Sequence, residues 1–233
     1  NACVTNMITE ALPITIQLAV GALILWLAVG LGLGIVAAKF KNRWPDTSSS
    51  VFVLLATSLP TFVTGLALLI WVTIKWKLVP LSLNGYTSFF ENPYKYFQYF
   101  ILPWITLAIA YAALYTRFTR AALLETLGED YIRTARAKGV GERVVFFKHT
   151  FRAVLAPIIT LAGLDFAGLI GGAIITETIF NLPGLGRLTL RSVYEFDLPV
   201  VLATTILAAV VVIVMNLIVD MLYAVLDPRV RVS

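Results

Sequence analysis

Charged residues are scarce in this chain of 233 residues, and their scarcity excludes an ordinary soluble domain. Only 13% of the residues are charged, whereas 59% are hydrophobic and the mean hydropathy is +0.88. A soluble globular domain typically has about 25% charged residues. The single cysteine, Cys3, has no second cysteine in this sequence with which to form a disulfide. The composition indicates that lipid surrounds much of the protein.

The chain also lacks the residues from which most active sites and metal sites are built. It has one histidine, His149, and one cysteine, so it offers no cluster of metal ligands. The phosphate-binding pattern G-x-x-x-x-G-K-[ST] does not occur in it. We therefore predict no catalytic residue, no cofactor and no metal in this chain. Its net charge of +5 is interpreted as membrane topology and not as nucleic-acid binding.

Long runs without charge predict five transmembrane helices in an all-α integral membrane protein. Four runs carry no charged residue, and a fifth carries only Asp165. Each reaches the roughly 20 residues that a helix needs to cross the hydrocarbon core, and none alternates as the strands of a barrel do. We predict one domain over 1–233, with spans at about 12–38, 47–74, 98–124, 153–176 and 198–226.

Lysine and arginine are unevenly divided between the two ends of these spans. Thirteen of the eighteen lie in 39–50, 117–152 and 227–233, and five lie in 75–98 and 177–198. Cytoplasmic loops of membrane proteins carry the excess of basic residues. The sequence therefore predicts that the N-terminus of this segment lies on the external side of the membrane and that the C-terminus is cytoplasmic.

The densest basic run lies in the cytoplasmic loop predicted over 125–152. The stretch "YIRTARAKGVGERVVFFKH" follows two acidic residues that suit a helix N-terminus, and its first glycine stands where a glycine would end that helix. From Val140 onward, a helical spacing of 3.6 puts four apolar residues on one stripe: Val140, Val144, Phe147 and Phe151. The loop is predicted to be a helix, a glycine turn and a second helix.

The pattern alone leaves three interpretations of this loop open. The stripe could lie on the membrane surface, with its basic side toward anionic lipid. It could pack against the cytoplasmic ends of the spans. It could also dock into a groove on a soluble partner.

Several segments resemble one family of membrane proteins, in the order in which that family has them. These are "GLALLIWVTIKWKLVPLSLNGY" (65–86), "RFTRAALLETLGEDYIRTARAKG" (117–139), "ETIFNLPGLGR" (177–187) and "VDMLYAVLDPRVR" (219–231). They resemble the B-type permease of bacterial dipeptide and oligopeptide ABC importers. The generic importer loop reads E-A-A, three residues and then glycine. When aligned on Gly139, those three positions hold Arg133, Thr134 and Ala135, a departure that is typical of the peptide subfamily.

The resemblance implies a type I importer permease fold, with a further helix upstream of residue 1, in a bacterial plasma membrane. It implies a complex with a second related permease, two cytoplasmic ATPase subunits that bind ATP and Mg²⁺, an external binding protein and a peptide substrate. The loop would be a pair of coupling helices docked on an ATPase subunit. Its coupling residues would be Glu129, Asp130, Tyr131, Ile132, Arg133, Thr134, Ala135, Arg136, Lys138, Gly139, Val140 and Phe147. Of these, Tyr131, Ile132, Val140 and Phe147 would fill the partner's groove.

Two acidic residues are candidates for the translocation path. Asp165 is the only charge within the five apolar runs, and a charge in lipid usually faces a cavity or a partner. It could attract the amino terminus of a peptide, or it could form a structural hydrogen bond to another helix. Glu177 follows the same span and is the second candidate. In the external loop, Pro183, Gly184 and Arg187 are predicted to cap the path or to meet the binding protein, with a simple connecting hairpin as the alternative.

Other functions remain open from the sequence. Closely similar permeases import nickel chelates and other small solutes. An ion-coupled secondary transporter would need more ionisable groups within its spans than Asp165. A membrane scaffold whose loop binds some other soluble protein is the third possibility.

Overall fold

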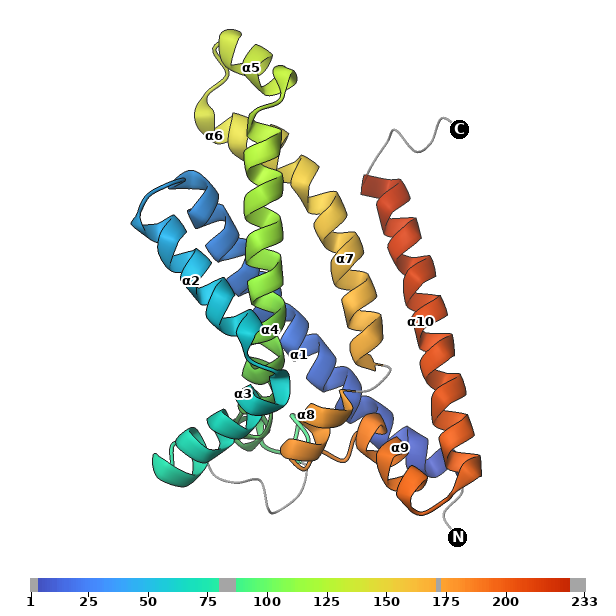
Figure 1. The fold of residues 1–233 in the computed structure, drawn as a ribbon. Helices are drawn as coiled ribbons and strands as arrows, with labels where there is room; N and C mark the ends of the chain where they lie inside the picture. Colours follow the sequence, from blue (N-terminus) through green and yellow to red (C-terminus); the bar gives the residue numbers. More distant parts are fainter. Residues whose placement is uncertain (1–3, 80–86, 171–172, 227–233) are drawn as a thin grey trace.

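The computed structural model describes residues 4–79, 87–170 and 173–226, and no strand occurs in these ranges. Of the described helices, four are long and apolar enough to cross a membrane without a break. They are α1 (Val4–Lys39), α4 (Pro93–Leu127), the stretch Glu142–Ile170 that contains α7 (Arg152–Ile170), and α10 (Leu198–Leu226). Figure 1 shows α4, α7 and α10 side by side, with α1 inclined across them. The predicted all-α membrane fold is confirmed.

The predicted span over 47–74 is not one straight helix. α2 (Trp44–Ser58) and the stretch Thr61–Lys75 meet at an angle of 99°. The second stretch contains α3 (Thr61–Leu68) and the π-helical η1 (Leu69–Lys75). The break is at Leu59, which is extended with ψ of 122°, because Pro60 disfavours a helical conformation in the residue before it. The apolar run is helical as predicted, but it bends at its proline.

The helix in the predicted span over 153–176 also ends early. α7 ends at Ile170, and Ala173 has a ψ of 52°, outside the helical range. A separate short helix, α8 (Ile174–Ile179), then begins, followed by α9 (Leu185–Tyr194). Both lie at the same end of the bundle as α3 (Figure 1). The end of the predicted span therefore belongs to a layer of short helices that covers the bundle.

The core is centred on the packing of α1 against α4. A side chain at Gly30 would come within 2.6 Å of the Tyr115 Cβ, and one at Gly34 within 2.6 Å of the Thr119 Cβ. Close approach of this kind is how helices pack in lipid, where the hydrophobic effect gives no drive for helix to bind helix. Trp26 of α1 is fully buried and stacks on Tyr111 of α4, with ring centroids 4.6 Å apart.

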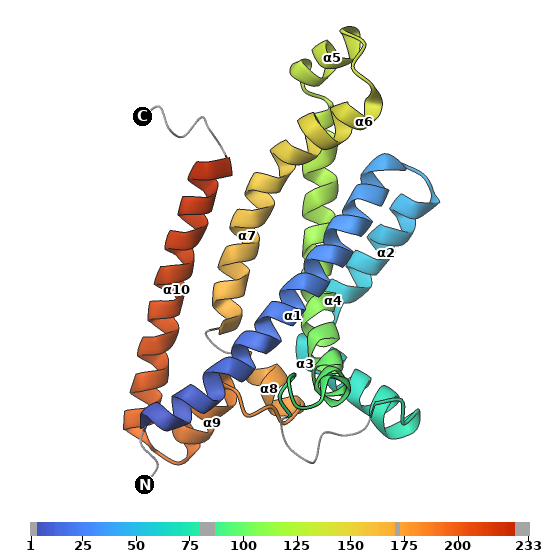
Figure 2. The same ribbon diagram turned by 180° about the vertical axis from the view of Figure 1, so that it is seen from behind.

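The two ends of the bundle differ in their elements. Figure 2 shows the segment between α4 and α7 projecting at one end, near the turn from α1 to α2, and α3, α8 and α9 at the other. α10 packs against α7 and α9. Part of the "VDMLYAVLDPRVR" segment and part of the segment 65–86 lie outside the described residues.

Candidate functional site

The segment between α4 and α7 forms a short helical hairpin that projects from the bundle (Figures 1 and 2). It consists of α5 (Asp130–Ala137), α6 (Glu142–Val144) and the π-helical η2 (Val145–Phe151), which continues into α7. Asp130 is in the first turn of α5 and Glu129 is the residue before it, so both acids lie at the positive end of the helix dipole. The helix, turn and helix predicted from the sequence are present.

Gly139 makes the turn of this hairpin. Its φ is 77°, in the left-handed region that glycine enters without steric cost. Its N–H donates to the Arg136 carbonyl at 2.9 Å, and the N–H of Val140 donates to the Ala135 carbonyl at 3.2 Å. This pair of bonds is the Schellman arrangement that ends a helix. The prediction that Gly139 ends the helix and forms the turn is confirmed.

Contacts between the two arms close the hairpin. Arg136 Nε donates to Glu142 Oε1 at 2.7 Å, and its Nη2 donates to Oε2 at 3.2 Å. α5 packs against η2, and Ile132 and Val145 are both fully buried. Ile132 was predicted to fill a partner's groove. It is instead part of the hairpin's own small core, so its side chain is not available to a partner in this structure.

The predicted apolar stripe is formed only in part, because η2 is a π-helix. The Phe147 and Phe151 rings still make an edge-to-face contact, with centroids 6.5 Å apart. In a π-helix the backbone bonds join residues five apart, so the 3.6-residue spacing no longer marks one face. The buried face of η2 holds Val145 and Thr150, and the Thr150 hydroxyl donates to the Val145 carbonyl at 3.2 Å. Phe147 lies elsewhere on the helix, in edge-to-face contact with Phe146 at 5.1 Å between ring centroids.

The outer surface of the hairpin combines apolar and basic side chains. Phe147 is 64% exposed and Tyr131 is 47% exposed. Arg133 lies 3.6 Å from Asp130, but both side chains are largely exposed, and such a pair adds little stability. The remaining residues predicted for docking lie in the same hairpin: Thr134, Ala135, Lys138 and Val140. A projecting surface with exposed aromatic rings and basic rims has the chemistry of a docking element.

Asp165, within α7, bonds to a neighbouring spanning helix. The Tyr115 hydroxyl of α4 donates to Asp165 Oδ2 at 2.7 Å. Tyr115 is buried and lies beside the Trp26 ring, whereas Asp165 is half-buried. Of the two roles predicted for Asp165, the structural hydrogen bond to another helix is therefore observed. It engages one carboxylate oxygen, and the side chain keeps part of its surface exposed.

Glu177 does not line a path, contrary to prediction, because its side chain is fully buried. Its Oε1 accepts a hydrogen bond from the Thr15 hydroxyl of α1 at 2.7 Å, and its Oε2 accepts one from the backbone N–H of Arg187 at 2.9 Å. The Thr15 oxygen in turn accepts from the N–H of Leu185 at 2.8 Å. Glu177 and Thr15 thus cap the first turn of α9 and tie α1, α8 and α9 together.

The external loop residues surround this buried carboxylate. A side chain at Gly184 would collide with the Glu177 carboxyl group, so glycine is required there for the close approach. Pro183, Gly184 and Arg187 also line a cavity of about 610 Å³ between the N-terminal part of α1 and α9. The loop is therefore packed closely around the Glu177 carboxylate and also faces a hollow.

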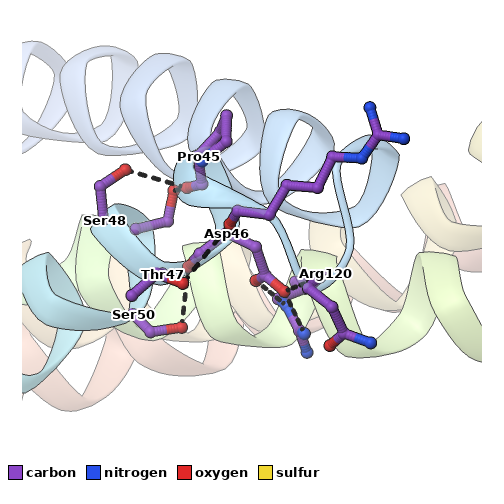
Figure 3. Close-up of polar contacts among 9 residues, drawn as sticks. Pro45, Asp46, Thr47, Ser48, Ser50 and Arg120 are labelled. Carbon is purple, nitrogen blue, oxygen red and sulfur yellow. Dashed lines mark hydrogen bonds and ion pairs between the residues drawn. The ribbon is translucent and has the colours of Figure 1, made fainter.

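Asp46 and Arg120 join α2 to α4 through an ion pair that the sequence did not predict (Figure 3). The Arg120 Nε donates to Oδ1 at 2.6 Å and the Nη2 to Oδ2 at 2.8 Å. The backbone N–H of Asn42 also donates to Oδ2, at 2.9 Å, and Asp46 is only 5% exposed. The two residues are 74 positions apart, so no local pattern could have paired them.

Potential metal ligands do not gather within the described part of the chain. No group of three or more histidine, cysteine, aspartate or glutamate side chains there could hold a metal ion. Cys3 lies outside the described residues.

Comparison with known proteins identifies relatives along nearly the whole chain. The model of a family described as binding-protein-dependent transport system inner membrane component matches residues 30–232. The chain is 36% identical over 228 residues to a protein of Sinorhizobium fredii named a probable peptide ABC transporter permease, across 98% of this chain and 72% of that protein. It is 40% identical over 217 residues to a glutathione transport system permease of Escherichia coli, across 93% of this chain and 68% of that protein.

A solved structure has the same arrangement of helices. The inward-facing MetNI methionine ABC transporter has a chain that superposes with a TM-score of 0.74, across 97% of this chain and 99% of that one. The sequence identity is 14%, so this likeness establishes the fold alone.

Proposed function

This chain belongs to the family of binding-protein-dependent transport system inner membrane components, and from that premise we propose that it is the permease subunit of an ATP-driven peptide importer. It would carry di- and oligopeptides across a bacterial inner membrane by alternating access. The observation that carries the proposal is a sequence identity of 36%, across 98% of the chain, to a protein named as a probable peptide ABC transporter permease. The glutathione permease points to the same chemical class, since glutathione is a tripeptide.

The projecting hairpin would be the surface on which an ATPase subunit docks. It has exposed aromatic rings at Tyr131 and Phe147, and a rigid shape set by Gly139 and by the Arg136–Glu142 pair. ATP and Mg²⁺ belong to the partner subunits in this proposal. Closure of the ATPase pair would favour one arrangement of the spans and its opening another, because nucleotide binds one state better.

The orientation follows from the same assignment. The hairpin and the basic turn from α1 to α2 would be cytoplasmic, and α3, α8 and α9 would face outside. An external binding protein would then deliver peptide at the end where Pro183, Gly184 and Arg187 lie. A second, related permease would complete the pathway.

Asp165 is the residue that we propose for contact with the peptide. Its Oδ2 accepts from Tyr115, and the side chain remains half-buried within α7, five residues before that helix ends at Ile170. Asp165→Asn keeps an acceptor for Tyr115 but removes the charge. A hydrogen bond to a charged group contributes about 1.5–3 kcal/mol. We therefore expect the KM for a peptide with a free amino terminus to rise about tenfold, measured by uptake of labelled peptide into proteoliposomes.

The control for this prediction separates charge from packing. Tyr115→Phe removes the hydrogen bond but leaves the carboxylate, so it is expected to affect stability more than peptide selectivity. An N-acetylated peptide lacks the positive amino terminus and should be carried equally by the wild type and Asp165→Asn. If the KM of the free peptide does not change in Asp165→Asn, Asp165 has only the structural role.

The proposed function is tested by ATP hydrolysis in the purified membrane complex that contains this chain. We expect hydrolysis to rise when the external binding protein is added with a dipeptide or a short oligopeptide, and not when it is added empty. If only a nickel chelate stimulates hydrolysis, the chain is still an importer permease, but its substrate is not a peptide. A complex without an ATPase subunit would contradict the coupling role, and it would favour a secondary transporter or a scaffold.

A further inference from the structure

A cavity of about 460 Å³ lies between α2 and α4, beside the ion pair drawn in Figure 3. α4 supplies Arg117 and Arg120, and α2 supplies Ser50, Val53 and Leu54. The cavity thus has guanidinium groups, hydroxyl oxygens and an apolar wall within one hollow. None of its lining residues has a role in the proposed transport.

The two arginines of this cavity differ in their charge balance. The Asp46 carboxylate neutralises Arg120 through the bidentate pair. Arg117 is exposed, and within the described residues no hydrogen bond or ion pair engages its guanidinium. The cavity therefore carries one uncompensated positive charge, which favours an anionic ligand.

The hydroxyl groups of the cavity act as acceptors. Ser50 donates its proton to the Asp46 carbonyl at 3.0 Å, and Ser49 donates to the Pro45 carbonyl at 2.8 Å. Their oxygens can accept from a ligand but their protons are already engaged, so the donors for an anion are the arginines. A ligand that fits would have an anionic group together with hydroxyl groups of its own.

The position of the cavity along α2 and α4 places it at the level of the lipid headgroups. Arg117 is the first charge after the charge-free run 96–116 of α4. Trp44, at the start of α2, is 81% exposed, as expected of an indole ring among lipid headgroups. Leu54 is 66% exposed, so an apolar strip continues from the cavity toward the middle of the bilayer.

We propose that this cavity binds the headgroup of an anionic phospholipid. The phosphate would lie at Arg117, a headgroup hydroxyl would donate to Ser50, and an acyl chain would run along Val53 and Leu54. Basic pockets between spanning helices at the cytoplasmic surface suit such headgroups. Free phosphate would satisfy only the guanidinium and would use neither the hydroxyl oxygens nor the apolar wall.

Native mass spectrometry of the purified importer complex tests the proposal. The complex would be titrated in detergent with dioctanoyl phosphatidylglycerol and, separately, with dioctanoyl phosphatidylcholine. A basic residue near a membrane surface contributes about 1 kcal/mol to binding of anionic lipid, which corresponds to roughly a fivefold change in Kd. We expect the wild type to retain phosphatidylglycerol preferentially, and Arg117→Gln to bind it about fivefold more weakly.

The matched control is Lys95→Gln, which removes the same charge from an exposed position at the other end of α4. It should leave lipid retention unchanged, and Arg117→Lys should keep most of it. The proposal is overturned if both glutamine variants lose lipid equally, or if the two lipids are retained alike. It is also overturned if glycerol phosphate displaces the lipid at equal concentration. Retention by the separate permease but not by the complex would show that another subunit covers the cavity, and would equally reject the proposal.

Discussion

Replacing Glu177 with alanine is expected to lower the midpoint of thermal unfolding more than any other single exchange at the external end. The exchange leaves the buried Thr15 hydroxyl and the Arg187 N–H without their acceptor. Each buried donor without a partner costs about 1–3 kcal/mol. In a protein of this size 1 kcal/mol corresponds to roughly 2–4 °C, so the midpoint should fall by several degrees, measured by the intrinsic fluorescence of the purified protein during heating.

Glu177→Gln distinguishes loss of the acceptor from loss of the charge. The amide keeps one acceptor oxygen for the first turn of α9, so this variant should lose less stability than Glu177→Ala. A matched exposed exchange is Glu195→Ala, whose carboxylate pairs with Arg191 at the surface of α9 and contributes little. Equal midpoints for Glu177→Ala and Glu195→Ala would show that the buried cap is not a stabilising element.

The same carboxyl group gives a dependence on pH. α8 lies outside the spanning helices, and burial raises the pKa of Glu177 above its ordinary value of 4.5, while the Thr15 hydroxyl and the Arg187 amide oppose the rise. A raised pKa means that the folded protein holds the proton more tightly than the unfolded chain. The stability of the wild type relative to Glu177→Gln is therefore greatest at low pH. It declines as the pH rises above about 4.5, through the raised pKa.

Local rules explain which parts of this structure the sequence could predict. A helix followed by glycine in a basic loop led directly to the turn at Gly139, because only the left-handed conformation closes that hairpin cheaply. Charge-free runs identified the spans, since their length is set by the membrane. The prediction of one span over 47–74 considered only hydrophobicity and overlooked Pro60. The bend at that residue follows because proline disfavours a helical conformation in the residue before it.

The features that the sequence did not predict depend on residues far apart in the chain or on an unusual helix. Thr15 and Glu177 are 162 positions apart, and Asp46 and Arg120 are 74 apart. A single sequence does not show which residues that are far apart in the chain lie close together in space. The stripe through Phe147 assumed 3.6 residues per turn, which the π-helix of η2 does not have. As a result Ile132 and Val145 form the inside of the hairpin, and Phe147 is left on its outside.

That position makes Phe147→Ala the functional exchange with the largest expected effect. The ring is 64% exposed, so the exchange removes little of the protein's own packing, and the unfolding midpoint should hardly change. An aromatic anchor at the centre of an interface commonly contributes more than 2 kcal/mol to binding. If the hairpin docks on an ATPase subunit, its affinity for that subunit should fall about thirtyfold, and peptide should no longer stimulate ATP hydrolysis.

Phe90→Ala is the matched control, because Phe90 is 94% exposed and lies in the turn before α4, at the end of that helix opposite the hairpin. It should co-purify with the ATPase subunits and respond to peptide as the wild type does. Phe147→Leu should recover part of the binding, since it restores apolar volume without the ring. The measurements are the amount of ATPase subunit retained on the tagged permease and the hydrolysis rate with loaded binding protein. If Phe147→Ala retains both at wild-type levels, the ring is not the anchor, and docking would have to rely on Tyr131 and the basic side chains of α5.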